Sequence, residues 1–128
     1  MPRGRRRNNS SVIPGPAEGP LVTLPYTVEL NDIPMMIVQH HESDYLLKRA
    51  IDQFDRLYAE GKDRAKIMAL AIHPYISGQP HRIKYLEAIY DYVKRHDGVL
   101  HWNGVEILEW YRAALAAGAA GAPTAIRA

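Results

Sequence analysis

The 128-residue sequence contains no cysteine. It therefore has neither a disulfide framework nor a thiolate metal site, and it fits a reducing compartment. No apolar run approaches the roughly 18 residues of a membrane span, and the N-terminus lacks the apolar core of a signal peptide. These absences predict a cytoplasmic protein with no membrane partner.

Charge is distributed unevenly along the chain. Four of the 16 basic residues are Arg3, Arg5, Arg6 and Arg7, which leaves 12 basic residues against all 14 acidic ones in the remainder. Residues 1–20 are rich in Pro, Gly, Arg, Asn and Ser and predict a disordered tail. Its arginines have two interpretations. They form either an arm that binds RNA, DNA or an anionic membrane, or part of a solvated tail, and we favour the solvated tail. We expect no nucleic-acid surface on the rest of the chain.

Three short apolar runs predict strands. The six residues Ile67–Ile72 suit a strand buried on both faces, as in a parallel sheet. Residues 21–30 are apolar and β-branched, although Pro25 cannot donate a ladder hydrogen bond. Residues 99–102 form a third, four-residue run.

Three stretches place apolar residues at three- and four-residue intervals, which predicts helices with one buried stripe. The first follows Ser43, an expected N-cap, and stops at Gly61. The second runs from about residue 82 to 95, and the third opens at Asn103, which makes a capping-box signal with Glu106. The stripes are Leu47, Ala50, Ile51, Phe54, Leu57 and Tyr58; Ile83, Leu86, Ile89, Tyr90 and Val93; and Ile107, Leu108, Tyr111 and Leu115.

The order of these elements predicts an α/β fold. Strands separated by helix-length crossovers pair in parallel through right-handed connections. We expect one domain over residues 21–117, flanked by the tail 1–20 and a flexible tail 118–128.

His73 is the leading candidate for a catalytic residue. It ends the central apolar run, and Pro74, Gly78 and Pro80 then turn the chain into a constrained loop. In parallel α/β folds the carboxyl ends of strands carry the chemistry. Histidine suits proton transfer because its unperturbed pKa lies near neutrality.

Three further polar residues have two interpretations each. Asn31 and Asp32 close the first strand, where they serve either a catalytic site or local turn chemistry. Arg82 either clamps an anion at a helix N-terminus or simply follows Pro80 into the helix. The adjacent His40 and His41 point different ways on any regular element, and no third ligand accompanies them. We therefore expect no metal and no cofactor.

Several segments resemble the C-terminal part of the polysaccharide deacetylase (NodB-homology) family, and its allantoinase-like branch most of all. They are P-Y-T-V-E-L-N-D (25–32), L-Y-A-E-G (57–61), A-L-A-I-H-P-Y-I-S-G-Q-P-H-R (69–82), H-D-G-V-L-H-W (96–102) and E-I-L-E-W (106–110). The resemblance extends over about residues 21–112.

The resemblance implies a fold and an activity. The fold is a partial (β/α) barrel, the C-terminal half of a distorted TIM barrel, with about three strands alternating with three helices. The activity is hydrolysis of a non-peptide carbon–nitrogen bond, with a small-molecule amide or an N-acetylated sugar as substrate. His73 would be the general acid, Asp32 would orient it, and Asn31 and Arg82 would line the substrate-binding rim.

The sequence departs from this family in one large respect. It has no T-F-D-D-like motif, no H-x-x-x-H motif and no R-x-P-Y motif, which in the family supply the base and, in metal-dependent members, the metal site. We expect a fragment that is inactive alone and that is completed by an N-terminal half in trans or forms a homo-oligomer through its open sheet edges. The alternative is a small non-enzymatic interaction module with a basic N-terminal arm.

Overall fold

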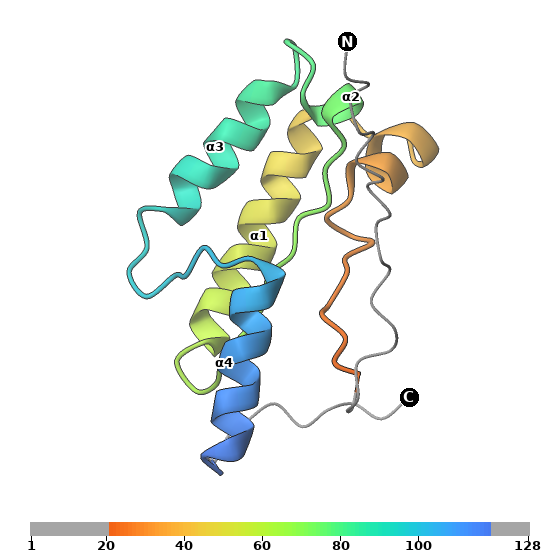
Figure 1. Ribbon diagram of the computed structural model, residues 1–128. Helices are drawn as coiled ribbons and strands as arrows, with labels where there is room; N and C mark the ends of the chain where they lie inside the picture. Colours follow the sequence, from red (N-terminus) through yellow and green to blue (C-terminus); the bar gives the residue numbers. More distant parts are fainter. Residues whose placement is uncertain (1–20, 119–128) are drawn as a thin grey trace, which may run out of the picture.

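The computed structural model describes residues 21–118 (Figure 1). Its helical elements, in chain order, are η1 (Ile33–Val38), α1 (Asp44–Glu60), α2 (Pro74–Ser77), α3 (Ile83–Val93) and α4 (Gly104–Ala116). The predicted tail 1–20 lies outside the described residues, and so does the predicted tail 118–128 apart from Gly118. None of the helices between residues 21 and 118 is both long and apolar enough to cross a bilayer.

The predicted partial barrel with three strands is wrong. Within residues 21–118 the three apolar runs form no sheet, and a single parallel bridge joins Asn31 to Ala71. In this bridge the Ala71 N–H donates to the Leu30 carbonyl at 2.9 Å, and the Asp32 N–H donates to the Ala71 carbonyl at 3.2 Å. A strand needs a neighbour along its length to satisfy its backbone groups.

The central run also differs from its predicted burial. Met68 and Leu70 are partly buried and pack against the core, whereas Ile67 and Ile72 are exposed. The middle of the run, residues 68–71, is therefore partly covered while both of its ends are exposed, so the run is not buried on both faces as predicted.

The helix predictions are confirmed for α1 and α3, which pack against each other (Figure 1). α1 buries Leu46, Ala50 and Phe54 at four-residue spacing. Leu46, rather than the predicted Leu47, belongs to the fully buried set, because the stripe is rotated by one position at this end. α3 buries Ile89 at its centre.

α4 forms where predicted but does not pack as predicted. Asn103 and Glu106 make the expected capping box, so the start of the helix is locally specified. None of its residues is fully buried, and the predicted stripe residue Leu115 is 50% exposed. An apolar helix face in this state lacks a packing partner.

The buried core lies at one end of the molecule, where η1 and α2 meet the first turns of α1. It consists of Leu30, Met35, Met36, Leu46, Ala50, Ile76 and Ile89. The other end is hollow. A cavity of about 880 Å³ opens there, and its lining includes Phe54, Tyr58, Met68, Leu100, Trp102 and Trp110.

The one-turn helix α2 has a sequence that fixes both of its ends. Pro74 occupies its first turn and removes a backbone N–H that would have no partner there. Gly78 follows the last residue, and a Cβ at this position would lie 2.4 Å from the Pro74 carbonyl oxygen. This close approach explains why a glycine stands four residues after the proline.

Gly78→Ala is expected to lower the free energy of unfolding by about 1–3 kcal/mol, the usual cost of overpacking. The added methyl group meets backbone rather than a flexible side chain, so the turn must shift. Urea denaturation of the full chain measures the change. Gly104→Ala is the matched control, because its Cβ would meet only the end of the Leu24 side chain. Equal stability of the Gly78→Ala variant and the wild type would contradict this account of α2.

Candidate active site

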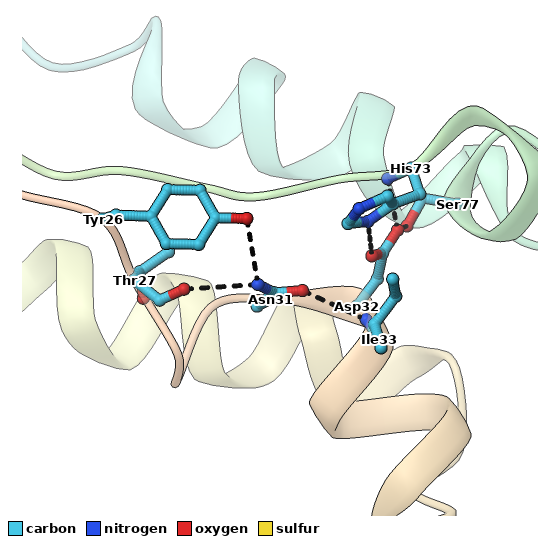
Figure 2. Close-up of polar contacts among 7 residues, drawn as sticks. All are labelled: Tyr26, Thr27, Asn31, Asp32, Ile33, His73 and Ser77. Atoms are coloured by element: carbon cyan, nitrogen blue, oxygen red, sulfur yellow. Dashed lines mark hydrogen bonds and ion pairs between the residues drawn. The ribbon is translucent and has the colours of Figure 1, made fainter.

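The parallel bridge between Asn31 and Ala71 brings Asp32 and His73 together. Because Asn31 lies opposite Ala71, Asp32 directly follows the bridge on one segment, and His73 follows it two residues later on the other. The two segments run in the same direction, so both side chains emerge at the same end (Figure 2). This is the arrangement that the sequence predicts for residues at the carboxyl ends of neighbouring strands.

The Asp32 carboxylate is fully buried, with 0% of the residue exposed, and it accepts three hydrogen bonds. Its Oδ1 pairs with His73 Nδ1 at 2.7 Å. Its Oδ2 accepts from the His73 backbone N–H and from the Ser77 hydroxyl, both at 2.7 Å. A buried carboxylate is tolerable only with such partners, because desolvation otherwise penalises its charge heavily.

Burial alone would raise the pKa of Asp32, since it disfavours the charged form. The hydrogen bonds from the His73 backbone, the His73 ring and the Ser77 hydroxyl outweigh burial and lower the pKa of Asp32 below its ordinary value of 3.8. The carboxylate is therefore ionised at neutral pH and acts only as an acceptor.

An ionised Asp32 fixes the tautomer of the neutral His73 ring. Since the carboxylate can only accept, the Nδ1 atom that faces it must carry the proton. The other ring nitrogen, Nε2, is then the unprotonated one. The His73 side chain is 33% exposed, so the buried Asp32 carboxylate binds one edge of the ring while part of the ring remains accessible to solvent.

Such a ring can transfer protons in either direction. Nε2 can accept a proton as a base, and the imidazolium that results is stabilised by the negative charge of Asp32 and can donate the proton as an acid. The Tyr75 ring stands edge-on to the His73 ring with centroids 5.8 Å apart and is itself largely exposed.

The lowered pKa of Asp32 predicts a loss of stability in acid. A carboxyl group with a lower pKa in the folded state contributes stability above about pH 3.8, and this contribution disappears as the pH falls through the folded pKa. Thermal melting of the full chain from pH 7 to pH 2 should therefore show a smaller acid-induced decline for Asp32→Asn than for the wild type. Parallel declines for the two proteins would contradict the account.

Asn31 is placed next to this pair, but its side chain is used locally. Its Nδ2 donates to Tyr26 Oη and to the Thr27 carbonyl, each at 3.4 Å, and its Oδ1 accepts from the Ile33 N–H at 3.2 Å (Figure 2). These contacts are the turn chemistry that the sequence offered as the alternative to substrate binding.

Arg82 lies at the N-cap of α3 and not in the hydrogen-bond network of Asp32. Its Nε donates to Ser43 Oγ at 3.1 Å, which links the start of α3 to the start of α1. Ser43 occupies the predicted N-cap position, but its side chain makes no capping hydrogen bond.

The metal site of metal-dependent family members has no counterpart in this part of the chain. Among residues 21–118 no three His, Asp or Glu side chains gather as ligands. His40 is exposed with a positive φ of 57°, and the His41 ring stacks on Tyr45 at 4.2 Å. The described residues do not fit a resident metal ion, and we assign it no step.

Ser77 is the member of the network that sequence reasoning missed. A signal was present, because His73 and Ser77 are four residues apart and flank a turn that Pro74 begins. The i,i+4 spacing places both side chains on one side of a helical turn. Without knowledge of the facing Asp32, however, a serine at this spacing has no special meaning.

Comparison with known proteins gives one match of note. The chain is 33% identical over 81 residues to a Schizosaccharomyces pombe protein described as "Putative polysaccharide deacetylase". The match covers 62% of this chain and 25% of that protein, so the chain spans about a quarter of the length of this relative. No family model matches the chain, and no solved structure matches it.

The match supports the relationship to the polysaccharide deacetylase family that the sequence motifs indicated. It does not extend to the allantoinase-like branch.

Proposed function

We propose that this chain supplies the acid–base part of a polysaccharide deacetylase-like hydrolase that acts on non-peptide carbon–nitrogen bonds. The observation that carries the proposal is the buried Asp32 carboxylate at 2.7 Å from His73 Nδ1. The relationship to the Schizosaccharomyces pombe protein supplies the class of reaction.

The geometry suits one step of amide hydrolysis in particular. Water attacks the carbonyl carbon to give a tetrahedral intermediate, and the C–N bond then breaks only if the departing nitrogen receives a proton. His73 first takes up a proton from solvent at Nε2, and the imidazolium then gives this proton to the departing nitrogen and returns to the neutral ring with its proton on Nδ1. The proton lost by the attacking water goes to the separate base described below. Asp32 keeps the Nδ1 proton in place and stabilises the imidazolium before the transfer.

The substrate class is the finer part of the proposal. The run A-L-A-I-H-P-Y-I-S-G-Q-P-H-R at 69–82 favours the allantoinase-like branch and hence a cyclic ureide, whereas the name of the relative favours an N-acetylated sugar. In either case, substrate contacts by Asn31 require release of its bonds to Tyr26 and Thr27, and contacts by Arg82 require movement away from Ser43. His73 and Asp32 are thus better supported than Asn31 and Arg82.

The base that activates water is proposed to come from further polypeptide. The observation that supports such a partner is the uncovered apolar surface at the hollow end of the molecule. Leu100, Trp102 and Trp110 line the cavity there and remain at least 38% exposed. The matched stretch makes up only a quarter of the relative, so a larger protein is the natural source of the missing cover.

A fusion experiment tests the proposed function. The full chain is joined behind the part of the Schizosaccharomyces pombe protein that lies outside the matched stretch. Acetate release from an N-acetylated sugar oligomer and ring opening of a cyclic ureide are then measured for the fusion and for the chain alone. We expect hydrolysis of one substrate by the fusion and none by the chain alone. A folded fusion that cleaves neither substrate would contradict the proposal.

The second candidate function is a non-enzymatic interaction module, and the packing of α4 is the observation that favours it. A helix with apolar residues and no fully buried side chain offers a surface for another polypeptide. Here the occupant would be the same complementary polypeptide, bound without catalysis. A stable complex with that polypeptide that forms equally well with His73→Ala and shows no hydrolysis would favour this function over catalysis.

A further inference from the structure

The Asp32 carboxylate is held by two different kinds of donor, and they do not act on the same oxygen. Oδ1 pairs with the His73 ring, whereas Oδ2 receives the His73 backbone N–H and the Ser77 hydroxyl. A carboxylate can rotate about its Cβ–Cγ bond. Fixing Oδ2 from two directions therefore sets the direction in which Oδ1 points.

We propose that Ser77 is a positioning residue for His73: by holding Asp32 Oδ2, its hydroxyl aims Asp32 Oδ1 at Nδ1 of the imidazole. This inference rests on the proposed function only for its catalytic meaning. The network itself is a property of the folded chain.

Burial supports this assignment over an incidental contact. Ser77 is 2% exposed and Asp32 is 0% exposed, so water does not replace the hydroxyl at the carboxylate. A charge-assisted O–H···O⁻ bond at 2.7 Å is also stronger than a bond between neutral groups. The Ser77 hydroxyl therefore donates its proton to Asp32 Oδ2.

The short helix α2 explains how the chain delivers both groups to one carboxylate. His73 is its N-cap in an extended conformation, with φ −119° and ψ 126°, and its ring meets the same carboxylate as the Ser77 hydroxyl. The Ser77 N–H bonds the His73 carbonyl at 3.0 Å and closes one turn. The turn begins at Pro74 and ends at Gly78, so the H-P-x-x-S-G spacing is what places imidazole and hydroxyl on the same side.

Loss of the Ser77 hydroxyl has two consequences in this account. Oδ2 retains only one donor, so the carboxylate is freer to rotate and Oδ1 less often faces Nδ1. The His73 ring then populates the tautomer with the proton on Nε2, which is the wrong form to accept a proton at that atom. The pKa of Asp32 should also rise toward its ordinary value, since one of the bonds that lower it is gone.

The test uses the full chain without substrate. Ring ¹⁵N shifts of His73 and the ¹³Cγ titration of Asp32 are recorded by NMR for the wild type, Ser77→Ala and Ser77→Thr, with signals assigned from His73→Gln and Asp32→Asn. We expect a several-fold larger share of the Nε2–H tautomer in Ser77→Ala, together with an Asp32 midpoint at higher pH. Ser77→Thr, which keeps the hydroxyl, should shift both signals back toward the wild type.

Two further variants keep the test decisive. Ser43→Ala is the matched control, because Ser43 bonds Arg82 and not Asp32, and it should leave both signals unchanged. If Ser77→Ala fails to fold, Ser77→Cys replaces it, since the thiol has a similar shape but is a weaker donor. Wild-type tautomer and Asp32 midpoint in a folded Ser77→Ala or Ser77→Cys variant would overturn the proposal.

These readouts are separate from catalysis. If the fusion described above shows no hydrolysis while the NMR signals change as expected, the proposed function fails and the positioning network remains. If hydrolysis is present and the signals do not respond to Ser77, the positioning role fails and the proposed function remains.

Discussion

Replacing His73 with alanine in the fused hydrolase is expected to slow C–N bond cleavage by about 10²–10⁴-fold, the usual contribution of a general acid. The physical reason is that the nitrogen leaves as a strongly basic anion unless a proton reaches it as the bond breaks. His73 Nε2 is the donor at this site, and the methyl group of an alanine has no proton to give in its place. The rate constant under saturating substrate, kcat, should carry most of the loss.

The control for His73→Ala is the same substitution at a histidine outside the site. His81 is exposed just before the start of α3 and lies outside the network of Asp32, so His81→Ala is the matched control and should retain the wild-type rate. Both variants are assayed at a temperature at which circular dichroism shows them to be folded. Equal rates in the His73→Ala and His81→Ala fusions would remove His73 from the mechanism.

Asp32→Ala is expected to lower the free energy of unfolding by about 3–5 kcal/mol. The substitution removes a fully buried carboxylate and leaves three donors without their acceptor, namely the His73 ring, the His73 N–H and the Ser77 hydroxyl. Unsatisfied buried donors carry a full desolvation cost. Most domains have a total stability of only about 5–15 kcal/mol, so the variant should be close to unfolding.

Urea denaturation monitored by circular dichroism measures this loss. Asp91→Ala, on the exposed face of α3, is the control and should show no comparable change. Asp32→Asn keeps the shape but replaces one acceptor oxygen with a donor, and it should fall between the two. A similar free energy of unfolding for Asp32→Ala and Asp91→Ala would contradict the description of Asp32 as the centre of the site.

The three longer helices of this chain, α1, α3 and α4, are predictable from sequence because their signals are local, whereas η1 and the one-turn α2 were not predicted. Apolar residues at helical spacing define α1 and α3, and the Asn103 and Glu106 pair defines the start of α4. What a helix packs against is not local. The stripe of α4 has the same form as that of α1, yet it is only partly covered.

The strands are not predictable in the same way. The Ile67–Ile72 run has the composition of a buried strand, but a strand exists only where a neighbour completes its hydrogen bonds, and residues 21–118 supply one bridge at Ala71. A short apolar run cannot show whether that neighbour is present. The same bridge nevertheless brings Asp32 to His73. One parallel contact in the correct register is enough to place the two residues that follow it side by side.

In the candidate site, too, some residues can be identified from local sequence signals and others only from contacts with distant segments. His73 and Asp32 are identifiable because each follows an extended apolar run, and the structure brings them together. Asn31 and Arg82 occupy the expected segments, but local partners engage their side chains, which sequence position alone does not reveal. Ser77 has meaning only once Asp32 faces it across 45 residues of sequence.

The measurement that tests the Asp32–His73 pair most directly is the ring ¹⁵N NMR spectrum of His73 in the full, unmodified chain, at a pH at which the ring is neutral. An ionised, buried Asp32 facing Nδ1 requires the proton to reside on Nδ1, so this nitrogen should show the shift of a protonated atom and Nε2 that of a bare one. In Asp32→Asn this preference should be lost. A wild-type spectrum in which Nε2 carries the proton and Nδ1 is bare would contradict the account, because a bare Nδ1 cannot donate to the ionised Asp32 and the pair would not exist as described.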